Sequence, residues 1–495
     1  MELFQQGLML LLHWQNFVWM NIGLVIGIVF GAIPGLTVIL AIVLFLPFTY
    51  SLGAVESFMF LLGIYCAGGY GGSISAILIH TPGTPHAAAT MLDGYPMAQR
   101  GEARKAMTIA LDASTVGGLL SAFSLLFFAP QVAKLAERVG TPEYFLVCLF
   151  GLTIIAGVSG KSLIKGLIAC FFGLFIETIG IDPMTGGTRF IFGNINLYSG
   201  FDLVICLIGL FALGEVLSKS KIGSGKTISN GVPNDNGTIS LQEYKRMGLP
   251  VILSAIIGII IGIIPGTGAS MASFFSYNIA KNISHHPEEF GHGSIEAISA
   301  AETANNAVTG ATLIPLLTLG IPGDGCVAIM MGALMINGLT PGPKLFQDHG
   351  PVMYAIMLGL VLVNIFMFVQ GRLLTKVFAK VINIPVSILT PIIVIFCFAG
   401  AFSVNSSTFD IGTTLVFAAI AYILGKLDFP TIPILLGLVL GQLTEENFRR
   451  SLILSDGSWK IFVSSPVCII FIGLILVALT LVFATKIKDM QREKN

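Results

Sequence analysis

The sequence contains few charged residues for its length. Of 495 residues, 26 are lysine or arginine and 26 are aspartate or glutamate, so charged residues make up 11% of the chain and the formal net charge is zero. A soluble domain carries roughly 25% charged residues. Hydrophobic residues make up 55%. These proportions exclude soluble, disordered and nucleic-acid-binding classes, and they indicate a polytopic protein of the lipid bilayer.

Other patterns are absent as well. The seven cysteines are scattered through apolar stretches without paired spacing, which argues against disulfides and a zinc site. No lysine or arginine precedes Arg100. The chain therefore lacks the basic start of a signal peptide, and we expect its first apolar stretch to stay in the membrane. Alternation with a period of two is also missing, which excludes a membrane β-barrel.

Long apolar stretches fill both halves of the chain, and proline and glycine interrupt many of them. A spanning helix needs about 20 apolar residues, so we expect about 11 to 13 spans together with re-entrant segments. The polar interval Ser218–Met247 reads as a linker. The sequence thus predicts an all-α polytopic fold with a first transmembrane repeat (1–217), a polar linker (218–247) and a second repeat with an extra C-terminal helix (248–495).

Two motifs recur in the same order on either side of the linker. The segment Gly31–Thr37 (GAIPGLT) returns as Gly262–Gly268 (GIIPGTG), and Thr81-Pro82-Gly83 returns as Ile321-Pro322-Gly323. Such a recurrence predicts an internal duplication. Broken helices at corresponding positions of two halves are typical of the binding site of a secondary transporter.

These breaks supply most of the candidate substrate-binding residues. Proline removes a backbone donor and glycine admits positive φ, so a helix stops there. The freed carbonyls can hold a cation, and the amides of the next helix start attract an anion. The candidates in the breaks are Pro34, Gly35, Thr37, Thr81, Pro82, Gly83, Thr84, Pro265, Gly266, Thr267, Pro322 and Gly323.

The glycine-rich segment Gly68–Ser75 (GGYGGSIS) has two interpretations. Small residues let membrane helices pack closely, and this interpretation is favoured when the segment is taken alone. The alternative is a backbone lining for substrate, to which Gly71, Gly72 and Ser73 contribute.

A carboxylate and two amides in the second half are candidates for ion coupling. Glu302 and Asn306 lie four residues apart on one helical face, Asn305 is adjacent, and Asp324 follows the second break. Ionisable residues at membrane depth are costly and by default functional. The opposing interpretation, equally weighted, places Glu302 near water at a helix start. We assign Glu302, Asn306 and Asp324 to ion coupling, and Asn305 and Asn306 to substrate binding.

Further polar residues are weaker candidates. Asp112, Glu177, Glu215 and Asp410 interrupt apolar stretches, and membrane boundaries are the favoured explanation. The segment His285–His292 has residue types that bind metals, but Pro287 breaks any helical face, so a hydrophilic loop is favoured. Asp93 is expected to cap a turn. No motif of a catalytic nucleophile, metal or phosphate site occurs, so we expect neither an enzyme nor a bound cofactor or metal.

Basic residues predict the orientation of the chain. The linker and the C-terminal tail are rich in lysine and arginine and should be cytoplasmic, whereas residues 1–16 carry neither. The two halves then enter the membrane from opposite sides, which predicts an inverted repeat.

The motifs together resemble a known family. The paired Pro-Gly breaks, Gly68–Ser73, Thr81–Pro85, Asp93–Pro96 and further motifs down to about Phe346 occur in the order found in the large membrane subunit of tripartite tricarboxylate transporters. The further motifs are His286–Gly291, Glu302–Ala307, Leu319–Gly323 and Gly338–Pro343.

This resemblance implies a bacterial inner-membrane permease that takes up citrate-like carboxylates, driven by a sodium or proton gradient. It implies two partners, a small membrane subunit and a periplasmic solute-binding protein. The alternatives are an integral membrane enzyme and a channel for small organic anions. A carrier loses accumulation when the ion gradient collapses, whereas a channel passes unsaturable downhill flux.

Overall fold

The computed structural model describes residues 2–136, 139–158, 162–219, 237–381, 384 and 386–492. Almost all of the secondary structure in this part of the chain is helical, which confirms the predicted all-α fold. Its two described strands, β1 (Gly180–Ile181) and β2 (Thr188–Arg189), form a short antiparallel hairpin.

The helices follow one another with short connections. Those of the first half are α1 (Glu2–Leu11), α2 (Trp14–Ala32), α3 (Val38–Phe45), η1 (Leu46–Ser51), α4 (Ala54–Ile79), η2 (Pro85–Ala87), α5 (Ala88–Gln99), α6 (Ala103–Ala136), α7 (Thr141–Val158), α8 (Leu163–Glu177), η3 (Ile195–Leu197), α9 (Leu203–Leu207), η4 (Ile208–Leu213) and α10 (Gly214–Lys219). Those of the second half are α11 (Leu241–Ile263), α12 (Gly268–Ile283), η5 (Pro287–Glu289), α13 (Ile295–Ala311), α14 (Leu313–Leu319), α15 (Gly325–Ile336), α16 (Leu345–Asp348), α17 (Gly350–Val381), α18 (Val386–Asn405), α19 (Thr408–Lys426), α20 (Ile432–Leu454), η6 (Trp459–Val463) and α21 (Pro466–Arg492).

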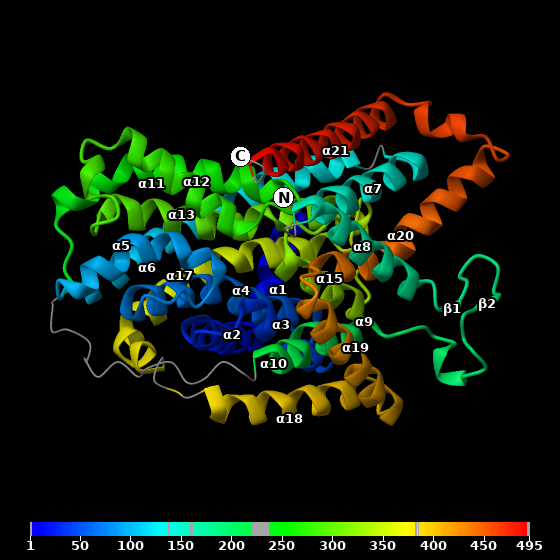
Figure 1. The fold of residues 1–495 in the computed structure, drawn as a ribbon, viewed down its shortest axis with the longest axis horizontal. Helices are drawn as coiled ribbons and strands as arrows, with labels where there is room; N and C mark the ends of the chain where they lie inside the picture. The colour runs from blue at the N-terminus through cyan, green and yellow to red at the C-terminus, as the bar shows by residue number, and fades with distance from the viewer. Residues whose placement is uncertain are drawn as a thin grey trace.

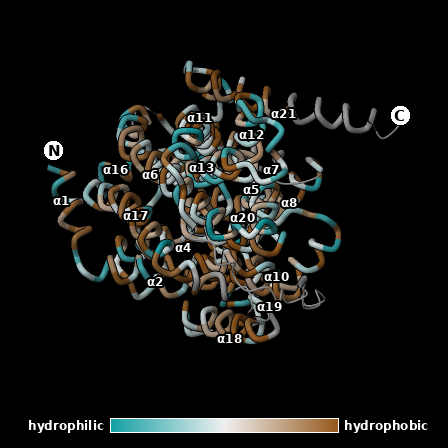
Figure 2. Tube along the Cα trace, turned by 90° about the vertical axis from the view of Figure 1, so that its left-hand side faces the viewer, coloured by the Kyte–Doolittle hydropathy of each residue, from teal (hydrophilic) through white to brown (hydrophobic). Residues whose placement is uncertain are grey.

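Seven described helices are long and apolar enough to cross a membrane, and shorter apolar helices accompany them. Several other apolar stretches are divided into shorter helices, and the expected 11 to 13 spans stay a prediction. Large apolar side chains also cover the outside of the bundle, as on α18, where Ile388 and Ile395 are 57% and 66% exposed. Figure 2 shows the brown of hydrophobic residues along the trace of α18 at the edge of the bundle. Such an exterior fits lipid and not water.

Glycines set the close packing of the first half. Gly23, Gly27 and Gly31 follow one another on successive turns of α2 and face α4. A Cβ at Gly23 would lie 2.1 Å from the Phe60 carbonyl oxygen, and one at Gly31 would lie 2.3 Å from that of Gly68. Residue numbers rise together along both helices, so α2 and α4 run parallel. Only glycine permits this backbone approach.

The second half repeats this arrangement. A Cβ at Gly258 of α11 would lie 2.6 Å from the Ala304 carbonyl oxygen of α13, and Gly262 faces Ala311 one to two turns further on. Helices α11 and α13 are thus also parallel and joined through glycine. The order of long helix, break and parallel partner is the same in both halves. The internal repeat stays a prediction, and this shared order agrees with it.

The two pairs start from opposite ends of the molecule. Phe17 and Asn21 of α2 meet Phe366 and Gln370 of α17, so these helices are parallel. Helix α17 is antiparallel to α6, because Gly118 faces Asn364 whereas Leu111 faces Gly371. In turn α6 is parallel to α13, since Gly117 meets Thr303 and Ser121 meets Gly310. Helices α2, α4 and α17 therefore run against α6, α11 and α13.

We call these two ends the basic end and the hairpin end. At the basic end α6 and α11 begin, and Lys105 and Arg246 pair there with Glu243 and Glu296. At the hairpin end lie β1, β2 and the C-terminal part of α20, which project from the bundle on the side away from α5, α11 and α12 (Figure 1).

The predicted linker is shorter than expected on its C-terminal side. Helix α11 begins at Leu241, so the last seven residues of the interval Ser218–Met247 are helical. The reason is a capping box in which the Ser240 hydroxyl accepts from the Glu243 amide while the Glu243 carboxylate accepts from the Ser240 amide. Residues 220–236 of the predicted linker lie outside the described residues.

Candidate functional site

The breaks predicted from the sequence interrupt the helices as expected, and matching breaks share backbone geometry. The first break of each half contains a glycine with positive φ, 93° at Gly35 and 82° at Gly266. Each second break starts with a left-handed residue, His80 after α4 and Gly320 after α14. Glycine suits three of these positions, because a left-handed conformation strains other residues.

Within each half, the two breaks touch. The Gly266 amide donates a hydrogen bond of 2.8 Å to the Gly323 carbonyl oxygen. In the first half, Gly83 lies so close to the end of α2 that a Cβ there would come 1.8 Å from the Gly31 carbonyl oxygen. The Gly83 amide also donates to the Gly72 carbonyl oxygen at 3.2 Å.

All four breaks meet at one cavity of about 250 Å³, which we call the central cavity. Its volume is close to the lower end of the roughly 300–1,000 Å³ of small-molecule sites. The lining residues are Thr37, Val38, Ile39, Thr84, Pro85, His86, Gly266, Gly268, Ala269, Ser270, Asp324, Gly325, Cys326, Ile432 and Leu436.

Helix starts surround the central cavity. Helix α3 begins at Val38, the turn leading into α5 at Pro85, α12 at Gly268 and α15 at Gly325. The first amides of a helix have no partner within the helix, and they carry the positive end of its dipole. The described lining contains no lysine or arginine. The cavity is therefore suited to an anion held by backbone amides and hydroxyls.

Two threonines place hydroxyls at this cavity. Thr84 Oγ1 is buried and has no hydrogen-bond partner among the described residues. Thr37 Oγ1 accepts from the Leu40 amide and donates to the Glu215 carboxylate, both at 3.1 Å. A buried hydroxyl without a partner is costly, so Thr84 is a group that a ligand can satisfy. The hydrogen bond from Thr37 also places Glu215 beside the central cavity, whereas the sequence favoured a position at a membrane boundary for Glu215.

Asp324 is the carboxylate of the central cavity. Its Oδ1 accepts from the Val327 amide at 2.8 Å, which caps α15, and its Oδ2 accepts from the Tyr65 hydroxyl of α4. A carboxylate beside an anion site repels the anion unless a proton or a cation neutralises it. Asp324 is thus placed where ion binding and anion binding influence each other.

Glu302 belongs to a second polar cluster, away from the central cavity. It is fully buried in the middle of α13, so the interpretation that placed it near water at a helix start is wrong. The hydroxyls of Ser73, Thr90 and Ser114 donate to its carboxylate, the last at 2.9 Å. The cluster joins α4, α5, α6 and α13.

Asn305 and Asn306 extend this cluster. Asn306 Nδ2 donates to the Glu302 carbonyl oxygen at 3.3 Å. Asn305 Nδ2 and Asn306 Oδ1 are buried without a partner among the described residues, and both lie beside Gly69. Carboxylate, hydroxyl and amide oxygens are ligands of hard cations. The same carboxylate can instead carry a proton.

Of the predicted substrate-binding residues, only Thr37, Thr84 and Gly266 line the central cavity. The other break residues do not line it. Gly35 and Thr81 are exposed, and the Thr81 hydroxyl donates to the Ile79 carbonyl oxygen. Sequence reasoning missed His86 and Ser270 as lining residues. Their positions at the start of the helices that follow the breaks were the available signal.

Gly71 and Gly72 serve packing in the described structure. A Cβ at Gly71 would lie 2.6 Å from the Ile28 carbonyl oxygen, and one at Gly72 would lie 2.3 Å from Thr84 Oγ1. This agrees with the favoured interpretation of close helix packing. Gly72 leaves room for the Thr84 side chain, so Gly72 affects the cavity only through Thr84.

The histidine-rich loop at 285–292 leads into backbone amides that bind Asp93. The amides of Gly291, Gly293 and Ser294 donate to one oxygen of the Asp93 carboxylate, and the Tyr277 hydroxyl donates to the other. Asp93 thereby ties the two halves together at the basic end.

Comparison with known proteins identifies the family. The sequence model of the tripartite tricarboxylate transporter TctA family matches residues 17–436. The chain belongs to this family. It is 36% identical over 469 residues, 94% of this chain and 93% of the relative, to an uncharacterized 52.8 kDa protein in the TAR-I ttuC' 3' region of Agrobacterium vitis. It is also 38% identical over 232 residues, 47% of this chain and 96% of the relative, to an uncharacterized protein in the TAR-II ttuC' 3' region. No solved structure matches.

Family membership confirms several predictions. The protein is a multi-pass transporter of the bacterial inner membrane, and its family is one of transporters and not of enzymes. The match extends beyond the motifs read from the sequence, since it starts in α2 and ends in α20.

Proposed function

We propose that the protein takes up citrate-like tricarboxylates or related small carboxylates and binds them in the central cavity. The convergence of four helix starts on this cavity carries the proposal. The starts of α3, α12 and α15 bring the positive ends of their dipoles to the cavity. The Thr84 hydroxyl, which has no hydrogen-bond partner among the described residues, adds one more donor. Backbone donors suit carboxylates, whose oxygens accept several hydrogen bonds.

Uptake in this proposal is coupled to a sodium or proton gradient. Two carboxylates support coupling, Asp324 at the central cavity and Glu302 among three hydroxyls. Both are partly or fully enclosed between the halves of the chain, where an uncompensated charge is expensive. Loading each with a cation or proton lowers this cost, and anion binding in the cavity favours the loading of Asp324.

Two inverted halves provide the alternating access of the proposed carrier. The opposite directions of the α2–α4 and α11–α13 pairs support this arrangement. The basic residues Arg100, Lys105 and Arg246 at one end support a cytoplasmic location for that end. The hairpin end then faces the periplasm.

The proposal includes two partners, a small membrane subunit and a periplasmic solute-binding protein. The description of the family as tripartite supports them. Selectivity among carboxylates is then shared between the central cavity and the binding protein.

Uptake of radiolabelled citrate and other di- and tricarboxylates tests the proposal. Cells expressing the chain with its two partner genes should accumulate at least one of them above its external concentration. Accumulation should disappear when ionophores collapse the sodium and proton gradients. Flux that does not saturate and survives the ionophores would support a channel, and no flux of any carboxylate would reject the proposed substrate class.

A further inference from the structure

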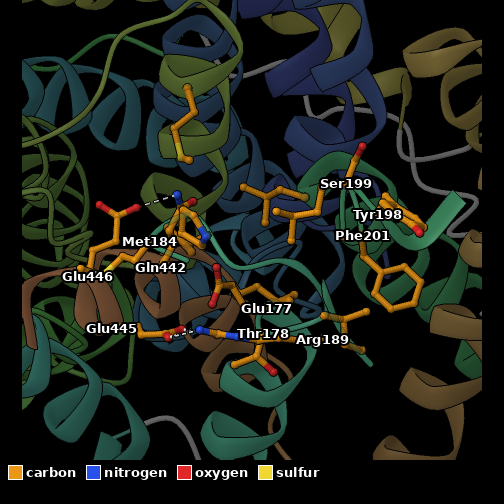
Figure 3. A pocket seen from close by; sticks show the side chains of 18 of the residues that line it. Glu177, Thr178, Met184, Arg189, Tyr198, Ser199, Phe201, Gln442, Glu445 and Glu446 are labelled. Carbon is orange, nitrogen blue, oxygen red and sulfur yellow. Dashed lines mark hydrogen bonds and ion pairs between the residues drawn. The ribbon is translucent and has the colours of Figure 1, made fainter. Parts of the chain in front are cut away.

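A second cavity, of about 420 Å³, lies at the hairpin end, and we call it the outer cavity. Residues 177–203, which include the hairpin, form one side, and α20 forms the other. Figure 3 shows Glu445 of α20 paired with Arg189 of β2, with Gln442 and Glu446 of α20 beside them. The sequence had not marked any of these four residues as candidates. Glu177, which also lines this cavity, was a weak candidate for which a membrane boundary was the favoured explanation.

The outer cavity lies on the same two helices as the central cavity. On α20, Ile432 and Leu436 line the central cavity, whereas Leu438, Val439 and Gln442 line the outer one. At a rise of 1.5 Å per residue, Leu436 and Leu438 are about 3 Å apart along the helix axis. Helix α15 begins at the central cavity with Gly325 and reaches the outer cavity with Met335.

The end of α15 locates the outer cavity in the molecule. Asn337, directly after α15, donates to Ser57 at the beginning of α4 at 3.4 Å. Helix α4 begins at the end opposite to the one where α6 and α11 begin. The outer cavity therefore opens at the hairpin end, on the opposite side of the central cavity from Lys105 and Arg246.

Four charged side chains hold the hairpin against α20. Arg189 forms a two-pronged ion pair with Glu445 at 2.7 and 2.9 Å and also contacts Asp182 at 2.7 Å. Arg449 contacts Asp182 at 2.9 Å and Glu445 at 3.0 Å. Two cations thus alternate with two anions, and every charge has two opposite neighbours. Planar guanidinium–carboxylate pairs of this kind fix geometry as well as energy.

Asp182 remains ionised in this cluster. The Thr185 hydroxyl donates to it at 2.6 Å and the Met184 amide at 2.9 Å. Together with the two guanidinium groups, these hydrogen bonds hold the pKa of the Asp182 carboxyl well below its usual value, against the effect of burial. The Asp182 charge therefore persists to a lower pH than that of an isolated aspartate.

We propose that the outer cavity is the extracytoplasmic entrance to the central cavity, and that the cluster Asp182–Arg189–Glu445–Arg449 is the latch that closes it. The inference rests on the proposed carrier function. Breaking the latch frees the hairpin from α20 and widens the entrance, while the central cavity keeps its own residues.

Thiol labelling tests the entrance. In a background with the seven native cysteines replaced, Gln442→Cys should react with a membrane-impermeant maleimide added outside intact spheroplasts. Asp456→Cys, exposed at the same end but outside the cavity, is the matched control. Labelling should strongly reduce carboxylate uptake by Gln442→Cys and leave uptake by Asp456→Cys unchanged. A Gln442→Cys that stays unlabelled, or that transports normally once labelled, would overturn the proposal.

The latch is tested by the labelling rate at position 442. Glu445→Gln should raise it about fivefold, whereas Asp456→Asn, which removes an exposed carboxylate at the same end that does not line the cavity, should leave it unchanged. Arg189→Lys keeps the charge but loses the two-pronged geometry, and it should give an intermediate rate if Glu445→Gln does not reach the membrane. Equal rates in all latch variants would overturn the latch. Labelling needs no transport, so absent uptake with normal labelling would reject the proposed function alone.

Discussion

The Tyr65 hydroxyl in the middle of α4 donates a hydrogen bond to the Asp324 carboxylate at the start of α15. Tyr65 of the first half thereby forms a hydrogen bond to the residue that follows the second break of the second half. The same carboxylate caps α15 through the Val327 amide. Movement of α4 against α15 must change the surroundings of Asp324, and this relationship gives a physical route from ion binding to the shape of the central cavity.

The hydroxyl of Thr84 should contribute directly to substrate binding. Thr84→Val keeps the shape of the side chain but removes the buried donor, so the KM for the carboxylate should rise about tenfold, equivalent to about 1.4 kcal/mol. Thr81→Val is the control, because Thr81 is exposed and does not line the cavity. Saturation curves of uptake measure the effect. An equal KM in both variants would place the substrate elsewhere.

The prolines of the second breaks should be needed for transport and not for expression. Pro82→Ala and Pro322→Ala restore an amide donor and let the preceding helix extend, which displaces the helix starts at the cavity. We expect normal protein levels with uptake lowered about tenfold or more. Pro130→Ala removes a proline from the interior of α6, away from the cavity, and should transport normally. Wild-type uptake in both break variants would remove the breaks from the mechanism.

Glu302 should set the ion dependence of uptake. Glu302→Gln cannot hold a negative charge, so the dependence of uptake on sodium or on pH should flatten while the protein level changes less. Glu296→Gln is the control on the same helix, since Glu296 is buried but paired with Arg246. Uptake at varied sodium concentration and pH measures both. An unchanged ion dependence with normal uptake would assign Glu302 a structural role.

The contact between the breaks of the first half should be necessary for stability. Gly83→Ala places a Cβ 1.8 Å from the Gly31 carbonyl oxygen, and a backbone atom cannot yield cheaply. We expect a loss of about 2 kcal/mol or more and a lower melting temperature in detergent. Gly412→Ala, which meets nothing within 4 Å, should melt like the wild type. Equal melting temperatures would show that the breaks do not touch.

The orientation of the halves can be measured by labelling from each side of the membrane. In the cysteine-free background, single cysteines in residues 1–16 should react only from the periplasm, and those in the linker and at the C-terminus only from the cytoplasm. Basic residues near the linker are the reason. If residues before Gln15 react only from the cytoplasm, the inverted arrangement fails, although the family assignment remains.

The sequence by itself determined the membrane class, the positions of the breaks and the family. Low charge requires a lipid-facing exterior, and Pro-Gly pairs stop a helix wherever they stand, so these features are local and readable. The capping box at Ser240 is equally local, and it ends the polar linker before Met247.

Only the tertiary structure decided which break residues face a common cavity. Thr81 and Thr84 stand three residues apart in one turn, yet only Thr84 lines the cavity, because Thr84 is buried against Gly72 of α4 whereas Thr81 is exposed. Glu302 finds Ser73, Thr90 and Ser114 on three other helices, and Arg189 finds Glu445 from far along the chain. Such contacts depend on how parallel and antiparallel helices cross, and periodicity along the chain carries no record of those crossings.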